Sequence, residues 1–137
     1  NLPESMHWHL PVAAGMSAIV GHMYPVYLKL RGGKGVATAL GVVLVLAPKA
    51  VALAFIVFVL IAGTTRVVAL ASMLAAVVFG VAQLYLTWDE AFRTPNASLT
   101  AFAVGIPLLI IWRHRSNIAR MLGRTESAIS ASKEDAK

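Results

Sequence analysis

The sequence predicts an all-α, polytopic helical integral membrane protein, and three observations lead to this fold class. Of the 137 residues, 58% are hydrophobic and only 13% are charged, which is more apolar surface than a soluble domain of this length can bury. Apolar stretches of about the length that spans a bilayer recur between short polar breaks. Basic residues gather in some of these breaks and acidic residues in another, as in loops on opposite sides of a membrane. We therefore expect about four to five membrane segments.

Charge and cysteine content narrow the possible functions. The net charge of +6 would suggest a nucleic-acid partner for a soluble protein. In a membrane protein, basic residues crowd the cytoplasmic loops, so we expect no nucleic acid. The chain has no cysteine, which excludes disulfides and thiol chemistry. His7 and His9 flank Trp8 in the pattern of an interfacial belt, so we expect no metal site, and we expect no cofactor.

Three apolar segments surround a longer central one. They are Leu10–Leu28, Val67–Leu86 and Leu99–Trp112. The second is an uninterrupted span of about 20 residues, whereas glycine and proline interrupt the other two and the last is short. The chain becomes polar after Trp112. We expect a membrane domain over residues 1–126 and a polar tail over residues 127–137.

The distribution of basic residues sets the predicted orientation. Four arginines follow the last apolar segment and place the C-terminus in the cytoplasm. One crossing back, the loop with Asp89 and Glu90 lies outside, and one further crossing returns Arg66 to the inside. The first basic loop belongs inside as well, because it carries Lys29, Arg31 and Lys34. The predicted location is the inner membrane, with three polar clusters on the cytoplasmic face.

The segment Val36–Ala62 must then cross the membrane an even number of times. Its 27 residues are too few for two spans of about 20 residues each. Two short helices folded back at Pro48-Lys49 satisfy this requirement, and protein or a water-filled cavity would cover their exposed backbone. The alternative is a single kinked span, which would place Arg66 outside. We favour the hairpin.

The most informative motif surrounds one lysine with glycines, in Gly32-Gly33-Lys34-Gly35, directly before a helix-forming run that includes Thr38. Glycine lets the chain adopt positive φ and lets a ligand approach the backbone. A helix N-terminus presents free N–H groups and a partial positive charge. Together with the Lys34 ammonium, these features predict a phosphate site. The alternative is a flexible cytoplasmic loop.

A second group of polar residues follows the last apolar segment. His114, Asn117 and Arg120 are spaced three apart, which places them on one face of a helix. Histidine can shuttle a proton, asparagine can bind a hydroxyl, and arginine can bind phosphate in bidentate fashion. The alternative is a basic interfacial helix that anchors the last span.

Two further residues have both a functional and a structural interpretation. Arg66 either marks the cytoplasmic side or points into a cavity. His22, beside the glycine loop, is either a buried hydrogen-bonded residue or a substrate contact, and its neighbours favour contact. We therefore add His22 and Arg66 to the candidate substrate-binding residues.

These motifs resemble two signatures of one enzyme family. Gly21-His22-x-x-Pro25-Val26 followed by Gly32-Gly33-Lys34-Gly35-Val36-Ala37-Thr38 resembles the second signature of bacterial acyl-phosphate:glycerol-3-phosphate acyltransferases of the PlsY type. His114-x-x-Asn117-Ile118-x-Arg120-Met121-Leu122-x-x-x-Glu126 resembles their third signature. Thr65-Arg66 is similar to a threonine-arginine segment between them. The resemblance runs from about Pro11 to Glu126.

The resemblance implies an enzyme of phospholipid biosynthesis. Family members are integral inner-membrane proteins that transfer an acyl chain from acyl phosphate to the 1-hydroxyl of glycerol 3-phosphate, giving lysophosphatidic acid and phosphate. By this resemblance the expected partners are glycerol 3-phosphate, acyl phosphate and membrane lipid. We expect His114 and Asn117 to be catalytic and Glu126 to cap or brace its helix. The residues expected to bind the two substrates are His22, Gly32, Gly33, Lys34, Gly35, Thr38, Arg66 and Arg120.

Two departures from the family pattern shape the expectations. Leu30 stands where the family often has phenylalanine. The family's first signature would precede Asn1, so we expect a fragment of a longer protein with little or no activity by itself. The alternatives are a membrane transporter or channel for an organic phosphate, and an inactive fragment of the enzyme. A carrier has no need of a paired His114 and Asn117 beside a phosphate loop.

Overall fold

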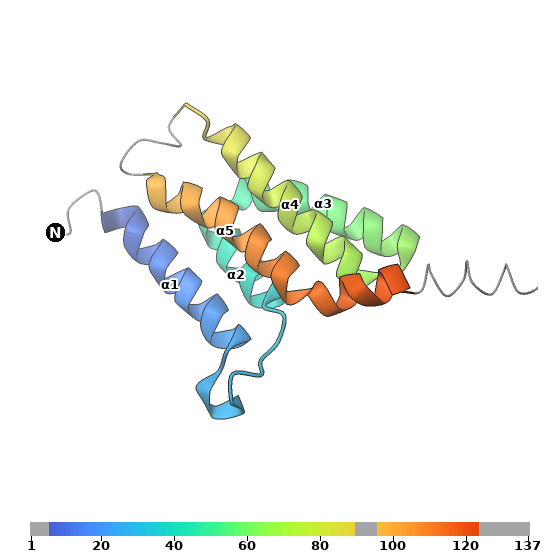
Figure 1. Cartoon of the computed structure of the whole chain (residues 1–137). Coiled ribbons are helices and arrows are strands. Elements are labelled where there is room, and N and C mark those ends of the chain that lie inside the picture. Colours follow the sequence, from blue (N-terminus) through green and yellow to red (C-terminus); the bar gives the residue numbers. More distant parts are fainter. Residues whose placement is uncertain (1–5, 90–95, 124–137) are drawn as a thin grey trace, which may run out of the picture.

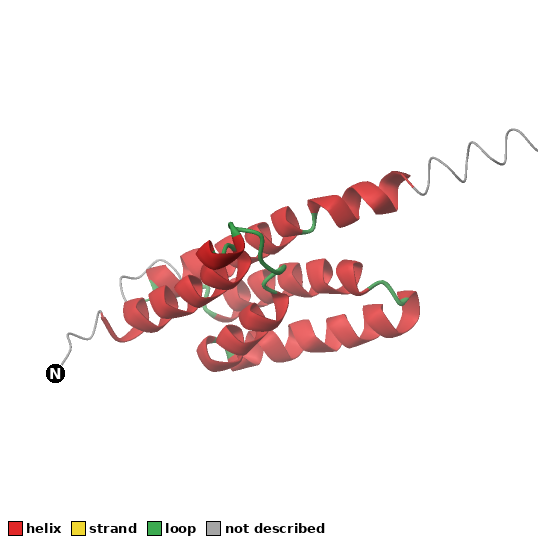
Figure 2. Ribbon diagram, turned by 90° about the horizontal axis from the view of Figure 1, so that it is seen from below, coloured by secondary structure: helices red, strands yellow, loops and turns green. Residues whose placement is uncertain are grey.

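The computed structural model describes residues 6–89 and 96–123, and this part of the chain is a bundle of helices without strands (Figures 1 and 2). A further helix, Arg115–Gly123, follows the last labelled helix at an angle of 52°. The labelled elements in chain order are α1 (Met6–Met23), the 3₁₀ turn η1 (Val26–Leu28), α2 (Val36–Leu46), α3 (Pro48–Thr65), α4 (Val68–Leu86) and α5 (Ala97–Arg113).

The longest apolar helices, α3 and α4, form an antiparallel pair. Each is long and apolar enough to cross a membrane, and α5 with Arg115–Gly123 adds a third candidate if the bent pair counts as one span. Arg66 turns the chain between α3 and α4 in the left-handed conformation, with φ of 56°. The predicted all-helical membrane fold is confirmed.

The break predicted inside Val36–Ala62 is also present, but the two helices are unequal. Ala47 separates α2 from α3, and Pro48 occupies the first turn of α3, where its missing N–H costs nothing. With 11 residues, α2 is about 16 Å long, roughly half of a hydrocarbon core of about 30 Å. The 18-residue α3 runs past Ala62 to Thr65 and is a full-length helix, so the expectation of two short helices was wrong for α3.

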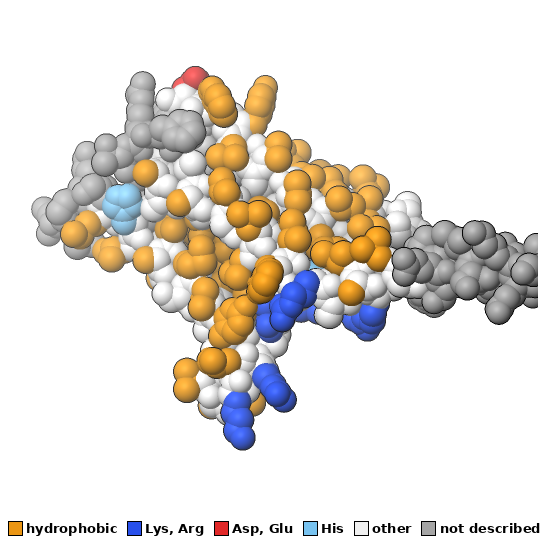
Figure 3. Space-filling view, in the orientation of Figure 1, with side chains coloured by type: hydrophobic (Ala, Val, Ile, Leu, Met, Phe, Trp, Pro, Cys, Tyr) orange, Lys and Arg blue, Asp and Glu red, His pale blue; other side chains and the backbone are white. Residues whose placement is uncertain are grey.

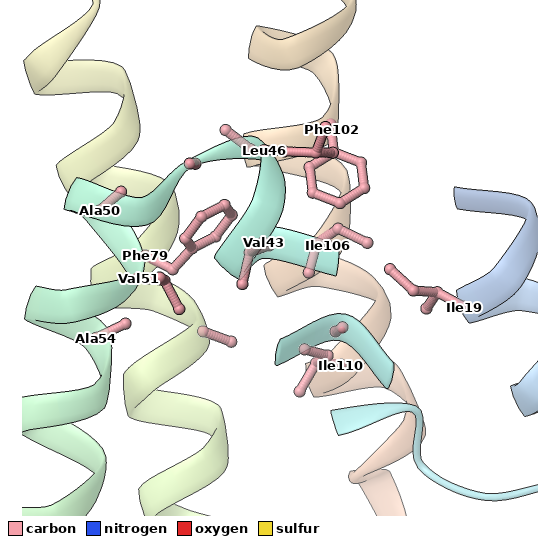
Figure 4. Packing of buried hydrophobic residues seen from close by; sticks show 14 of the residues in the cluster. Ile19, Val43, Leu46, Ala50, Val51, Ala54, Phe79, Phe102, Ile106 and Ile110 are labelled. Carbon is pink, nitrogen blue, oxygen red and sulfur yellow. The ribbon is translucent and has the colours of Figure 1, made fainter. Parts of the chain in front are cut away.

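The core lies where α2, α4 and α5 meet (Figure 4). Phe102, Ile106 and Ile110 recur every four residues along α5 and are almost completely buried. They face Val43 of α2 and Phe79 of α4 in one apolar cluster. This packing fixes the N-terminus of α2 beside the C-terminus of α5, which is where the predicted site residues lie.

Charge divides the bundle into two ends. The glycine loop, the α3–α4 turn and the helix Arg115–Gly123 lie at the same end, away from the start of α1 (Figure 1). Asp89, the single acidic residue in the described part of the chain, lies at the opposite end from the cluster of blue Lys and Arg side chains (Figure 3). The structure therefore brings the three predicted polar clusters to one end.

Candidate functional site

The glycine loop packs closely against the end of α1. The Gly32 N–H donates to the carbonyl oxygen of Met23 at 3.2 Å. A Cβ at Gly32 would collide with the backbone carbonyls of His22 and Met23, and one at Gly33 would lie 2.5 Å from His22 Nε2. Gly35 has φ of 75°, and a Cβ there would collide with the Met23 side chain. Close approach to the α1 backbone accounts for glycine at position 32, and positive φ accounts for it at position 35, whereas the obstacle at position 33 is only the end of the His22 side chain.

The same loop ends at an uncapped helix N-terminus. Gly35 is the N-cap residue of α2 and makes no side-chain cap hydrogen bond. The first N–H of α2 to bond within the helix is that of Ala39, which donates to the Gly35 carbonyl at 2.8 Å. The N–H groups of residues 36–38 have no intrahelical partner, and the Lys34 side chain beside them is exposed. This arrangement suits an anion.

Arg113, at the C-terminus of α5, holds the loop in place. Its Nη2 donates to the carbonyl oxygens of Gly32 and Gly33, each at 2.8 Å, and to that of Met23 at 3.3 Å. Its Nε donates to Gly33 O at 3.3 Å, and its guanidinium lies 4.9 Å from the ring centre of Tyr24. Arg113 is one of the four arginines after the last apolar segment, which the sequence analysis used only as an orientation signal, so this role was missed. Because Arg113 and Gly32 are 81 positions apart, the sequence around either residue does not indicate the contact.

His114 forms the bend between α5 and the next helix. Its side chain is 1% exposed, and Nδ1 lies 2.8 Å from the Ile110 carbonyl oxygen. Because a carbonyl only accepts, Nδ1 carries a proton, which leaves Nε2 as the acceptor nitrogen whenever the ring is uncharged. The His114 carbonyl in turn accepts the N–H groups of Asn117 at 2.8 Å and Ile118 at 3.0 Å. His114 thus connects the end of α5 to the start of the helix that carries Asn117.

Asn117 and Arg120 face a shallow pocket of about 460 Å³ against the first turn of α4. Val67, Ala69 and Met121 complete its lining. Among the described residues, the Asn117 side-chain oxygen has no hydrogen-bond partner, which is uncommon for a buried acceptor and leaves its accepting capacity unused. The expectation that His114, Asn117 and Arg120 share one helix holds for the last two, since His114 lies at the bend.

The remaining predicted residues lie around the glycine loop and around the pocket that holds Asn117. Arg66 is exposed and directly precedes Val67, so it lies at the rim of the pocket that holds Asn117. His22 is exposed beside Gly33, and Thr38 is half-buried on the first turn of α2. Arg120 Nε also contacts the Ser116 carbonyl of its own helix at 3.4 Å. Glu126 lies outside the described residues.

Within residues 6–89 and 96–123, the cations of the site have no acidic side chain beside them. Lys34, Arg66, Arg113 and Arg120 lie at this end of the bundle, and no acidic residue occurs between residues 5 and 88. A cluster of this kind, with helix N–H groups beside it, creates a positive potential that favours an anionic ligand.

An apolar groove of about 120 Å³ begins next to the glycine loop. Val36, the first residue of α2, lines it together with residues from α3, α4 and α5, including Phe55, Phe79 and Ile110. Among the described residues that line it, Ser72 alone is polar, and its hydroxyl donates to the Val68 carbonyl at 2.9 Å. The groove therefore offers an apolar surface to a hydrocarbon chain whose polar end reaches the loop.

The fold and the site define a polytopic helical membrane protein with one strongly basic end. The chain belongs to the glycerol-3-phosphate acyltransferase family, whose model matches residues 2–124. This confirms the resemblance drawn from the two motifs.

Relatives named glycerol-3-phosphate acyltransferase support the assignment. The chain is 46% identical to the protein of Myxococcus xanthus over 125 residues, covering 91% of this chain and 60% of the relative. It is 41% identical to the protein of Halorhodospira halophila over 120 residues, which covers 88% of this chain and 57% of that relative. The chain thus spans rather more than half the length of these relatives.

Two solved structures share the fold. Both are of PlsY, an integral membrane glycerol 3-phosphate acyltransferase. The glycerol 3-phosphate form aligns with a TM-score of 0.72 and 36% identity, over 87% of this chain and 56% of that one. The lysophosphatidic acid form aligns with a TM-score of 0.71 and 39% identity, over 87% and 57%.

Proposed function

We propose that the protein transfers an acyl chain from acyl phosphate to the 1-hydroxyl of glycerol 3-phosphate in phospholipid biosynthesis. The products are lysophosphatidic acid and inorganic phosphate. The observation that carries this proposal is the fork of hydrogen bonds from Arg113 to Gly32 and Gly33, because it joins the two family motifs into one site. The glycerol 3-phosphate and lysophosphatidic acid forms of the related PlsY support the choice of substrate and product.

The phosphate groups are held by the cationic end of the bundle. In this proposal Gly32, Gly33 and Gly35 shape the cradle, and Lys34 with the free N–H groups of α2 binds the phosphate of glycerol 3-phosphate. His22 and Thr38 line the cradle. Arg66 and Arg120, at the second pocket, bind phosphate oxygens of the acyl donor.

The reaction needs positioning and charge neutralisation rather than a covalent enzyme intermediate. The 1-hydroxyl oxygen attacks the acyl carbon, the bond from that carbon to the phosphate oxygen breaks, and the hydroxyl proton passes to the leaving phosphate. The unpartnered Asn117 oxygen accepts from the hydroxyl before attack. His114 Nε2 is an alternative acceptor for the same hydroxyl proton, in the tautomer with Nδ1 protonated that the Ile110 carbonyl selects. Orienting the two substrates lowers the entropic part of the barrier.

The acyl chain occupies the apolar groove among α2, α3, α4 and α5. The groove starts at Val36, so a chain lying in it has its carbonyl end near the glycine loop. The basic end of the bundle faces the cytoplasm of a bacterial inner membrane under the positive-inside rule, and the C-terminus lies on the same side.

The test is an activity measurement with the protein expressed from its complete reading frame and reconstituted in lipid vesicles. With palmitoyl phosphate and glycerol 3-phosphate, we expect lysophosphatidic acid and inorganic phosphate in equal amounts. Omission of glycerol 3-phosphate should abolish both. A folded protein that forms neither product contradicts the proposal.

A further inference from the structure

The connection between α1 and α2 exposes apolar side chains on a projecting tip, which we define as residues Val26–Arg31. Val26 is 83% exposed and Tyr27 is 85% exposed, and Leu28 and Leu30 are more than half exposed. The tip extends away from the helices at the basic end of the bundle (Figure 1). The space-filling view shows hydrophobic and basic side chains together on this projection (Figure 3).

The tip has a defined backbone structure. The Leu30 N–H donates to the Pro25 carbonyl at 3.0 Å, and the Arg31 N–H donates to that of Leu28 at 3.0 Å. Lys29 and Leu30 have φ of 51° and 63°, a conformation that costs about 1–2 kcal/mol for a residue other than glycine. The base of the tip is fixed by the bond from Gly32 to Met23. The backbone thus maintains a shape that presents the apolar side chains outward.

The charge of the tip is entirely positive. Lys29 and Arg31 alternate with Leu28 and Leu30, and Lys34 follows shortly after. Exposed apolar groups interleaved with cations are typical of segments that lie in a membrane interface and attract anionic lipids. Tyrosine is also favoured at this depth, because its ring is apolar and its hydroxyl remains hydrated.

The position of the tip fits the same partner. It leaves the bundle sideways at the level where α1 ends and α2 begins (Figure 1). We propose that the tip is an interfacial anchor for anionic lipid. Its apolar side chains enter the boundary between headgroups and acyl chains, and Lys29 and Arg31 bind lipid phosphates.

The absence of cysteine allows the tip to be labelled at one position. Tyr27→Cys, carrying an environment-sensitive fluorophore, is reconstituted in vesicles of phosphatidylglycerol and phosphatidylcholine. We expect blue-shifted emission, quenching by lipids spin-labelled near the glycerol backbone, and protection from aqueous iodide. The same label at Ser116→Cys, an exposed polar position at the same end, should be more accessible to iodide.

Lipid preference tests the role of the two cations. Quenching by headgroup-labelled phosphatidylglycerol relative to phosphatidylcholine gives the preference of the tip for anionic lipid. Lys29→Gln and Arg31→Gln should each lower it about fivefold, the equivalent of about 1 kcal/mol per cation. Lys49→Gln, at the start of α3 on the opposite end, is the matched control and should leave it unchanged.

Two results would overturn the proposal. A label on Tyr27→Cys that is as accessible to iodide as the one on Ser116→Cys would place the tip in water, available to a soluble protein. An anionic preference that survives the double substitution of Lys29 and Arg31 would exclude them as the lipid contacts. Neither readout involves a substrate, so the outcome is independent of the proposed reaction.

Discussion

Arg113 Nη2 lies 2.8 Å from the carbonyl oxygen of Gly32, although the two residues are 81 positions apart. This contact attaches the glycine loop to the end of α5, one residue before the bend at His114. The loop at α2 and the helix that carries Asn117 are therefore held in a fixed relation by one side chain.

Arg113→Lys should loosen the loop, because an ammonium cannot donate to several carbonyls in the planar fork that guanidinium provides. Loss of one charged hydrogen bond costs about 1.5–3 kcal/mol, so we expect kcat/KM to fall about 10- to 150-fold. Trypsin should also cleave faster after Arg31 and Lys34. Arg115→Lys is the control, since Arg115 is exposed and stacks on Trp112 at 5.0 Å. If kcat/KM and the rate of trypsin cleavage change equally in Arg113→Lys and Arg115→Lys, Arg113 has no special role in holding the loop.

Alanine at Gly32 should destabilise the protein more than alanine at Gly33. A Cβ at Gly32 meets the backbone carbonyls of His22 and Met23, whereas one at Gly33 meets the end of the exposed His22 ring. We expect a loss of about 1–3 kcal/mol for Gly32→Ala and less than that for Gly33→Ala, measured by thermal unfolding in detergent.

Combining each glycine substitution with His22→Ala separates a clash with the backbone carbonyls from a clash with the His22 ring. His22→Ala should restore the stability of Gly33→Ala, since it removes the obstructing ring, and should not restore Gly32→Ala. Gly41→Ala is the control, because a Cβ there has no neighbour within 4 Å and should stabilise α2 by up to about 1 kcal/mol. Rescue of both loop variants would contradict the packing described for Gly32.

Asn117→Ala should abolish activity without lowering stability. The side-chain oxygen has no partner, so its removal should change the free energy of unfolding by no more than about 0.5 kcal/mol. We expect kcat to fall at least about 100-fold, as for loss of a group that positions a reacting hydroxyl. Ser98→Ala is the matched control, because Ser98 Oγ is also buried without a partner but lies at the other end of α5. Loss of stability without loss of activity in Asn117→Ala would assign this residue to the fold.

Lys34→Ala should raise the KM for glycerol 3-phosphate more than Lys29→Ala does. Lys34 adjoins the free N–H groups of α2, whereas Lys29 lies on the projecting tip. Losing a charged contact to phosphate costs about 1.5–3 kcal/mol, which corresponds to an increase in KM of tenfold or more. Steady-state kinetics at constant ionic strength measures this difference. Similar KM values in the two variants would reduce the loop lysine to general surface charge.

Local signals predicted the ends of some elements and failed at others. Glycine before α2 and proline at the start of α3 both act within one helical turn, so the sequence predicted both helix starts. The end of α3 was placed too early, because the polar residues after Ala62 indicated a break. Thr64 and Thr65 instead donate their hydroxyls to the carbonyls of Leu60 and Ile61, each at 2.7 Å, and the helix continues.

The candidate site was predicted by residue type but not by geometry. Regular spacing placed His114, Asn117 and Arg120 on one helix, while the bend at His114 separates the first from the others. The clamp by Arg113 depends on how α5 packs against α2, and no pattern within either segment indicates that contact. The positive-inside rule already explained an arginine at the end of a membrane span, so Arg113 gave no separate indication that it binds the glycine loop.

In the proposed reaction, the glycine loop at the N-terminus of α2 binds the phosphate of glycerol 3-phosphate. Solid-state NMR of the ¹⁵N-labelled protein, expressed from its complete reading frame in lipid vesicles, measures this through ³¹P–¹⁵N dipolar couplings to the bound ligand. We predict couplings to the backbone nitrogens of residues 36–38 and to Lys34 Nζ. In Lys34→Ala the side-chain coupling should disappear while the backbone couplings remain. Saturable binding of glycerol 3-phosphate without any coupling to these nitrogens would contradict the claim.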